Sequence, residues 1–251
     1  MGIDIGGSGI KGAPVHIPTA NMTVAKRMRI PTPQPSTPEA VAEVIEQILD
    51  HFSWEGPVGC TFPAIVRRGV VLSAANVSDA WIGIDAEAVF ARTTGREFHV
   101  LNDADAAGIA EVDAGAARGV NGVVVMLTFG TGIGSAVFLD GALVPNTEFG
   151  HLEFKGDIAE RYAAARLVED KSLGEEEGLE IDVWAARVNE YLHYLDRIFS
   201  PDLFVIGGGI SKEFDQFSQY IDTQVRVVPA ELRNNAGIVG AALAAQRRFF
   251  Q

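Results

Sequence analysis

Short apolar runs alternate with glycine-rich turns along the chain, a pattern typical of buried strands in an α/β protein. The run at residues 2–5 leads into the glycine-rich segment 6–12, and the run at residues 123–127 leads into the similar segment 130–136. A further short apolar stretch follows each segment, so each is expected to form a β-hairpin whose glycines permit positive φ and close backbone approach. This internal repeat predicts two lobes of similar fold.

Apolar residues at helical spacing lie between the expected strands. One helix is expected to begin at Pro38, directly after Thr37, and to carry a buried stripe up to Leu49. A second helical stripe begins at Trp184, and a final helix is expected over residues 240–248. The remaining strands are expected at residues 58–62, 70–72, 98–101 and 203–206, and the acidic segment 171–180 indicates an exposed connector.

The composition is that of a globular protein. The chain has 251 residues, 47% of them hydrophobic and 21% charged, which suffices for one large domain or two lobes. The formal net charge of −13 disfavours broad nucleic-acid binding, because that affinity depends on many cationic contacts with phosphates. No apolar run reaches the roughly 18 residues needed to span a bilayer.

The start of the chain and its cysteine content favour a cytoplasmic protein. The first residues enter a strand and turn without the charged and apolar regions of a secretory signal. The single cysteine, Cys60, is expected to be a small buried residue, and it cannot form an intramolecular disulfide. A reducing compartment suits such a chain.

Three glycine-rich turns, each after an apolar strand, are candidates for binding phosphates through backbone N–H groups, although a single such turn is more often a plain hairpin. The first turn is accompanied by Asp4, which can orient Mg²⁺ through water, and by Lys11, a point charge for phosphates. The candidate residues of the three turns are Gly6, Gly7, Ser8, Gly130, Thr131, Gly132, Gly208 and Gly209.

Asn102 and Asp103 follow the strand expected at residues 98–101, and open α/β sheets bind ligands at such strand ends. A carboxylate at this place can accept the proton of a substrate hydroxyl, while an amide fixes that hydroxyl. A structural alternative stays open, in which Asp103 or Asp105 is the N-cap of the helix that follows.

Glu148, His151 and Glu160 form a second polar group, whose acceptors can bind several neighbouring hydroxyls at once. A lone histidine is more often a structural hydrogen-bonding residue, so the group alone does not define a site. A metal site at His151 and Glu153 lacks further ligands at usable spacing.

In this order, the motifs at residues 4–11, 101–103, 129–134 and 148–151 resemble the ROK family of sugar kinases across essentially the whole chain. The resemblance implies an α/β, actin/hexokinase-like (ribonuclease H-like) kinase fold with two lobes and a cleft. It implies a small lobe of residues 1–108, joined by the C-terminal helix at 237–251, and a large lobe of residues 109–236. It also implies that Asp103 is the general base, that Asn102, Glu148, His151 and Glu160 contact the sugar, and that the protein is a homodimer.

The chain departs from the common ROK pattern after His151, where residues 152–160 replace a cysteine-rich zinc segment. We therefore expect Mg²⁺ and no zinc. The replacement makes the chain similar to the polyphosphate glucokinase branch of the family, which implies polyphosphate and ATP as donors and glucose or mannose as acceptor. Thr61, Pro63 and Asn76 resemble sugar-side residues, and Gly208 and Gly209 resemble a nucleotide-side turn.

A polyphosphate donor would need a basic track on this acidic protein. Lys11, Arg161, Arg166 and Lys171 are expected to contribute to it, and residues 26–29 and 67–68 are further basic clusters. Two alternatives stay open, a strictly ATP-dependent hexokinase and a non-catalytic sugar-sensing protein of the same family. An actin-like ATPase would not need the Asn102–Asp103 pair together with Glu148 and His151.

Overall fold

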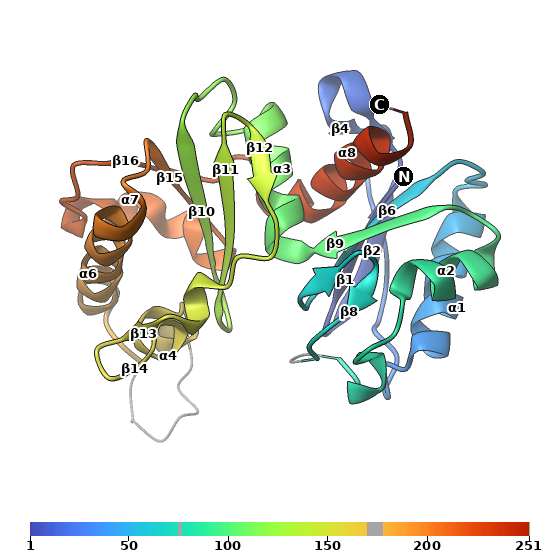
Figure 1. Cartoon of the computed structure of the whole chain (residues 1–251), viewed down its shortest axis with the longest axis horizontal. Helices are drawn as coiled ribbons and strands as arrows, with labels where there is room; N and C mark the ends of the chain where they lie inside the picture. The colour runs from blue at the N-terminus through green and yellow to red at the C-terminus, as the bar shows by residue number, and fades with distance from the viewer. Residues whose placement is uncertain (75–76, 170–177, 251) are drawn as a thin grey trace. The chain divides into compact units, whose positions relative to one another are not determined.

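The computed structural model describes residues 1–74, 77–169 and 178–250 of the chain (Figure 1). The chain forms two compact units, the first comprising Met1–Ala114 with Asn235–Gln251 and the second Gly115–Asn234. Each unit is built around its own five-stranded sheet. Asn76 and Lys171, two residues predicted to contribute to the site, lie outside the described residues.

The sheet of unit 1 combines an antiparallel hairpin with two parallel strands. Its strand order is β5 (Met28–Ile30), β2 (Gly9–Ala13), β1 (Gly2–Gly6), β6 (Val58–Phe62) and β9 (Phe98–Asn102). Strand β1 is antiparallel to β2 and parallel to β6, which is in turn parallel to β9. The carboxyl ends of β1, β6 and β9 therefore meet at one edge of the sheet.

Alternate residues of these strands face two different helix layers (Figure 1). The Ile3 side packs against α1 (Pro38–His51) and α2 (Ala86–Thr94) in one hydrophobic core. The Gly2 side packs against α8 (Ala236–Phe250), because a Cβ at Gly2 would lie 1.9 Å from the Ile238 carbonyl oxygen. Helix α3 (Asp103–Ala114) packs beside α8.

Helix α1 begins where the sequence predicts. The Thr37 hydroxyl accepts a hydrogen bond from the Ala40 amide, Pro38 occupies the first turn, and the apolar stripe is buried. The last helix begins earlier than expected, at Ala236 rather than residue 240. Glycines in its first two turns made the helical pattern hard to recognise in the sequence. Gly237 lets α8 lie close to Asp4, and Gly240 lets it lie close to the backbone of α3.

Unit 2 repeats the sheet of unit 1. Its strand order is β12 (Ala142–Val144), β11 (Ile133–Leu139), β10 (Val123–Phe129), β15 (Leu203–Gly207) and β16 (Arg226–Pro229). Directions also match, because β10 is antiparallel to β11 and parallel to β15. Two similar folds, predicted from the repeated glycine segment, are therefore confirmed.

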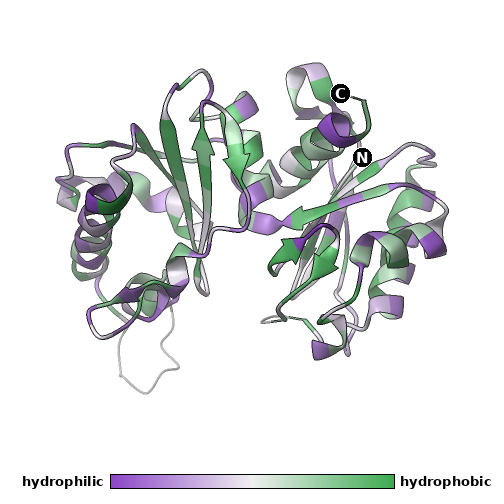
Figure 2. Cartoon of the chain, in the orientation of Figure 1, coloured by the Kyte–Doolittle hydropathy of each residue, from purple (hydrophilic) through white to green (hydrophobic). Residues whose placement is uncertain are grey.

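The core of unit 2 lies between its sheet and α6 (Ile181–Phe199), whose predicted stripe from Trp184 is buried. Hydrophobic residues fill the strands, and hydrophilic residues cover the outer side of α6 (Figure 2). The shorter helices of this unit are α4 (Ala159–Ala163), α5 (Arg166–Glu169) and α7 (Phe214–Phe217).

The remaining elements are short. Small hairpins are formed by β3 (Val15–His16) with β4 (Asn21–Met22), β7 (Val66–Arg67) with β8 (Val70–Val71), and β13 (Glu153–Phe154) with β14 (Asp157–Ile158). Six 3₁₀ helices are described: η1 (Ile17–Thr19), η2 (Asp79–Trp81), η3 (Phe149–His151), η4 (Gly209–Glu213), η5 (Ser218–Tyr220) and η6 (Arg233–Asn235). None of the helices in the described ranges combines the length and apolarity needed to cross a membrane.

Candidate active site

Asp4 lies at the centre of a polar group in unit 1, two residues before the first glycine turn. The Thr61 hydroxyl donates a hydrogen bond to Asp4 Oδ1 over 2.9 Å, and Lys11 Nζ lies 3.2 Å from Asp4 Oδ2. Gly237, in the first turn of α8, packs against the same carboxylate. The structure thus brings Asp4 and Lys11 together, and it places the fully buried Thr61 with them.

Asn102 ends β9 and caps the helix that follows. Its Oδ1 accepts hydrogen bonds from the amides of Ala104 (2.8 Å) and Asp105 (3.2 Å), and its Nδ2 donates to the Ala64 carbonyl over 3.1 Å. The N-cap alternative was open for Asp103 and Asp105, but α3 starts at Asp103 and Asn102 is the residue before it. Pro63, next to Ala64, is thereby held near this strand end.

Asp103 is exposed, whereas Asn102, Ala104 and Asp105 on either side of it are buried. Its carboxylate lies in the first turn of α3, and its Oδ1 accepts from the Ala104 amide over 2.9 Å. Asp103 therefore presents its carboxylate to solvent at the carboxyl end of β9, where a base can meet a substrate hydroxyl.

The second and third glycine turns lie side by side in unit 2. Strands β10 and β15 are parallel, with Thr128 opposite Gly207, so both turns leave the same edge of the sheet. Gly208 has φ of 84°, and a Cβ there would lie 2.0 Å from the Phe129 carbonyl oxygen.

The sequence predicted positive φ at glycines of the first two turns, residues 6–12 and 130–136, but none of these glycines has it. Glycine instead provides space at these places. A Cβ at Gly9 would lie 2.7 Å from Arg29 Nε, and a Cβ at Gly132 would lie 2.4 Å from Glu160 Oε2. Close approach by neighbouring side chains therefore explains Gly9 and Gly132, whereas a Cβ at Gly130 would meet open space.

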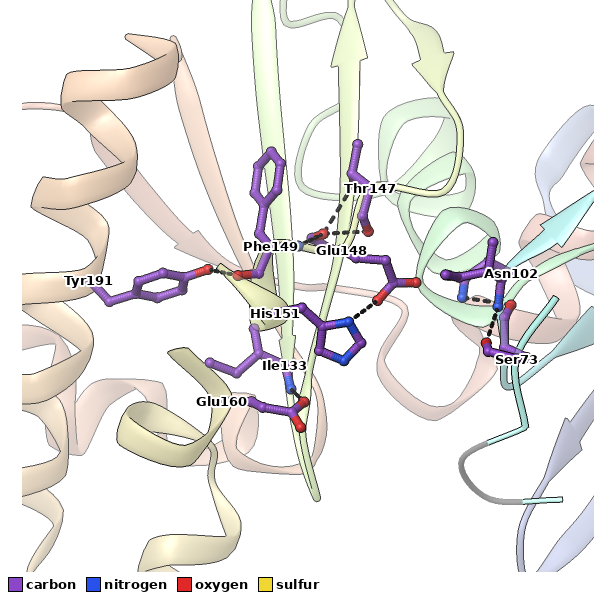
Figure 3. A network of polar contacts seen from close by, with 12 residues as sticks. Ser73, Asn102, Ile133, Thr147, Glu148, Phe149, His151, Glu160 and Tyr191 are labelled. Carbon is purple, nitrogen blue, oxygen red and sulfur yellow. Dashed lines mark hydrogen bonds and ion pairs between the residues drawn. The ribbon is translucent and has the colours of Figure 1, made fainter. Parts of the chain in front are cut away.

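Glu148, His151 and Glu160 gather in unit 2, beside the second glycine turn (Figure 3). His151 Nδ1 lies 3.8 Å from Glu148 Oε2, and Glu160 Oε2 accepts a hydrogen bond from the Ile133 amide over 3.4 Å. Burial raises the pKa of Glu148, and the Glu160 carboxylate raises it further, while His151 acts in the opposite direction. The three predicted residues thus form one polar group with two acidic acceptors.

Buried contacts that the sequence did not reveal hold this group in place. The Tyr191 hydroxyl donates a hydrogen bond to the Phe149 carbonyl over 2.7 Å, from within the core (Figure 3). Ser135 Oγ accepts from the Phe149 amide over 3.0 Å and donates to the Thr147 carbonyl over 2.7 Å. Tyr191 belongs to the apolar stripe of α6, so its spacing indicated burial but not this hydrogen bond.

Residues 152–160, which replace the zinc segment of the common ROK pattern, form the β13–β14 hairpin and lead into α4. Phe154 packs among the rings of Tyr162, Tyr191 and Tyr194, with centroids 5.2 to 5.5 Å apart. This aromatic cluster attaches the hairpin to α6 shortly before Glu160. In the described part of the chain, no three His, Cys, Asp or Glu side chains gather as a metal site.

The basic residues predicted for a donor track come from both units, Lys11 from unit 1 and Arg161 and Arg166 from unit 2. Arg161 forms an exposed ion pair with Asp157 over 3.4 Å. Arg166 reaches the second glycine turn through its backbone, since its amide donates to the Gly130 carbonyl over 3.0 Å. Lys11 is the predicted track residue that lies beside the first turn.

Two sheets of the same strand order, each with a glycine-rich turn in its first hairpin, define the two-lobed actin-like kinase fold. The ROK family model matches residues 1–168, and the chain belongs to the ROK family.

Similar proteins share nearly the full length of the chain. A polyphosphate glucokinase of Mycobacterium tuberculosis (strain ATCC 25618 / H37Rv) is 47% identical over 245 residues, which covers 97% of this chain and 90% of the relative. The polyphosphate glucokinase of Mycobacterium leprae (strain TN) is 46% identical, covering 97% and 74%.

Solved structures agree with this. The inorganic polyphosphate/ATP-glucomannokinase of Arthrobacter sp. strain KM superposes with a TM-score of 0.90 at 45% identity, covering 98% of each chain. A ROK family glucokinase from Streptomyces griseus, solved with glucose and AMPPNP, has a TM-score of 0.81 at 24% identity over 98% of each chain, and supports the fold alone.

Proposed function

We propose that this protein is a phosphotransferase that moves the terminal phosphoryl group of inorganic polyphosphate to the 6-hydroxyl of glucose or a related hexose such as mannose, with ATP as a second donor. The names of the relatives at 46% and 47% identity and of the Arthrobacter structure support this donor and acceptor. The structural observation that carries the proposal is Asp103, exposed in the first turn of α3 and fixed by the Asn102 cap.

Asp103 acts as the general base. Its carboxylate accepts the proton of the 6-hydroxyl while the hydroxyl oxygen bonds to the terminal phosphorus of the donor. The bridging P–O bond breaks, and its electron pair leaves with the shortened polyphosphate, or with ADP when ATP is the donor. The proton remains on Asp103 until solvent removes it.

Glu148, His151 and Glu160 bind hydroxyls of the hexose. Two carboxylates and one imidazole offer acceptors and a donor on one side of a ring. The pKa of Glu148 is raised because this carboxylate is held partly buried, where it can meet a ligand. The Asn102 side chain already makes three hydrogen bonds, so its main contribution is to position Asp103 and the Pro63 segment.

The donor phosphates are bound by the amides of the three glycine turns and by Lys11. Both carboxylate oxygens of Asp4 already have partners, so a metal ion would meet Asp4 through water rather than directly. That fits Mg²⁺, which keeps several waters and takes its other ligands from phosphates, where it offsets their charge.

The test is the substitution Asp103→Asn, which keeps the shape of the side chain and removes the base. Turnover of glucose is expected to fall about 10²- to 10⁴-fold with either donor, with the unfolding midpoint little changed. Asp85→Asn, the same change at the N-cap of α2, is the matched control and should leave turnover intact. Retention of more than about a tenth of wild-type turnover by the Asp103 variant would contradict the assigned role.

A further inference from the structure

A row of polar side chains crosses four neighbouring strands of the unit 1 sheet. Strand pairing places Thr61 opposite Asp4, Asp4 opposite Lys11, and Lys11 opposite Arg29. Directly paired residues project from the same side of a sheet, so all four lie on the side that α8 partly covers. The row ends at Arg29 on β5, the edge strand.

Arg29 reaches back from this edge to the first glycine turn. Its Nη2 donates a hydrogen bond to the Ser8 carbonyl over 3.0 Å, and its guanidinium passes directly over Gly9. Together with the Lys11–Asp4 contact of 3.2 Å, this places two cations next to a turn predicted to bind phosphates.

The two cations are accessible. Helix α8 packs mainly over β1, β6 and β9, while Arg29 is exposed and the Lys11 side chain retains 27% of its exposure. The opposite side of the same strands is different, because Ile10 is fully buried and Ile30 packs against that core. A ligand can therefore reach the charged side of β2 and β5.

The architecture does not require these charges. In unit 2 the repeated glycine segment places Gly134 where unit 1 has Lys11, and β12 pairs with β11 only at residues 137–139, so the corresponding sheet forms without such a pair of cations. Like charges directly opposite one another are unfavourable, and Asp4 neutralises one of the two. The row holds two cations and one carboxylate, and such a local excess of positive charge in a chain with a formal charge of −13 favours an anionic ligand.

We propose that Lys11 and Arg29 bind successive phosphates of linear inorganic polyphosphate, and that Arg29 contacts phosphates beyond those that ATP supplies. This inference rests on the proposed function. Lys11 lies beside the turn that would hold the terminal phosphates, and Arg29 lies one strand further out, a step of about 5 Å.

Arginine suits this position because its planar fork can make two hydrogen bonds to one phosphate. Arg27 precedes β5 and donates to Asn235 Oδ1 over 2.6 Å, next to the start of α8, which makes it the next cation for a longer chain. Within unit 1, the proposed track therefore runs along β5.

The test compares wild type with Arg29→Ala and with Arg92→Ala, a control that removes an exposed arginine from α2 on the opposite side of the sheet. Steady-state kinetics are measured with long-chain polyphosphate, with tripolyphosphate and with ATP, each at low and moderate salt. Binding of a fluorescently labelled long-chain polyphosphate is measured separately by anisotropy, without sugar.

For Arg29→Ala we expect KM and Kd for long-chain polyphosphate to rise about threefold to tenfold, the range of a charge-assisted contact at a partly screened surface. The slope of log Kd against log salt should decrease by about one, as for the loss of one phosphate contact. KM for ATP and glucose should change less than twofold, and Arg92→Ala should match wild type.

Equal effects of Arg29→Ala on long-chain polyphosphate and on ATP would overturn the assignment of Arg29 to the extended part of the donor. Unchanged affinity for long-chain polyphosphate in a correctly folded Arg29→Ala protein would overturn the proposal that Arg29 binds the donor. If the wild type itself does not use polyphosphate, the proposed function fails instead, so the two failures are distinguishable.

Discussion

Replacing Asn102 by alanine tests how the strand end supports Asp103. The substitution removes the acceptor for two amides at the start of α3, and loss of an N-cap costs about 0.5–2 kcal/mol. It also removes the donor to the Ala64 carbonyl, and an unsatisfied buried carbonyl costs about 1–3 kcal/mol. The free energy of unfolding should therefore fall by about 3 kcal/mol.

Catalysis should suffer as well, because the first turn of α3 carries Asp103. A misplacement of about 1 Å can cost about 10²-fold in rate, so kcat should fall strongly while KM for glucose changes little. Asn102→Ser separates the two contributions, since serine is a favoured N-cap that adds no charge, and it loses the donor to the Ala64 carbonyl.

The assay combines urea unfolding with steady-state kinetics on the same preparations. Asp85→Ala is the matched control, because Asp85 caps α2 in the same unit by accepting from the Ala88 amide over 3.0 Å. It should lose about 1 kcal/mol and keep its kcat. An Asn102→Ala protein that loses no more stability than this control, or that keeps wild-type kcat, would refute the reasoning.

Three further predictions concern the sugar-binding group and the metal. The pKa of Glu148 is raised in the folded protein, so its ionisation lowers the free energy of unfolding as the pH rises from the ordinary glutamate pKa through the raised pKa. Glu148→Gln should therefore be more stable than wild type at about pH 7 but not at about pH 4, and it should bind glucose more weakly. A difference in thermal unfolding that does not depend on pH would contradict this. Tyr191→Phe should cost about 1 kcal/mol, the low end of the range because the Phe149 carbonyl keeps its bond from the Leu152 amide, and should raise KM for glucose more than KM for the donor; urea unfolding and kinetics measure both. Chelation should abolish activity and Mg²⁺ alone should restore it, with metal analysis finding no stoichiometric zinc; one zinc per chain would disprove the expectation.

Features set by neighbouring residues were predictable from the sequence. The cap at Thr37, the stripe of α6 beginning at Trp184 and the two glycine hairpins depend on spacings within about one element, and the structure confirms them. Motif order supplied the family and the candidate residues. The lobe boundaries predicted from the sequence stay a prediction.

Features set by strand pairing and by side-chain geometry were not predictable. The sugar-side role of Thr61 stays a prediction, but its hydrogen bond to Asp4 depends on the parallel pairing of β1 with β6, which the sequence does not show. The cluster at residues 26–29 was a candidate basic patch, but only the register of β2 and β5 shows that Arg29 lies opposite Lys11. Such contacts depend on residues far apart in the chain, and periodicity carries no information about them.

The central claim, that this protein phosphorylates a hexose from polyphosphate, is tested most directly by a reaction without nucleotide. Purified protein is incubated with glucose, Mg²⁺ and long-chain polyphosphate, and glucose 6-phosphate is detected with an NADP-linked dehydrogenase. We expect product at a rate that depends on both substrates, none after the polyphosphate is digested beforehand with an exopolyphosphatase, and almost none with the Asp103→Asn protein. Product formed with ATP but not with polyphosphate would contradict the claim and identify an ATP-dependent hexokinase instead.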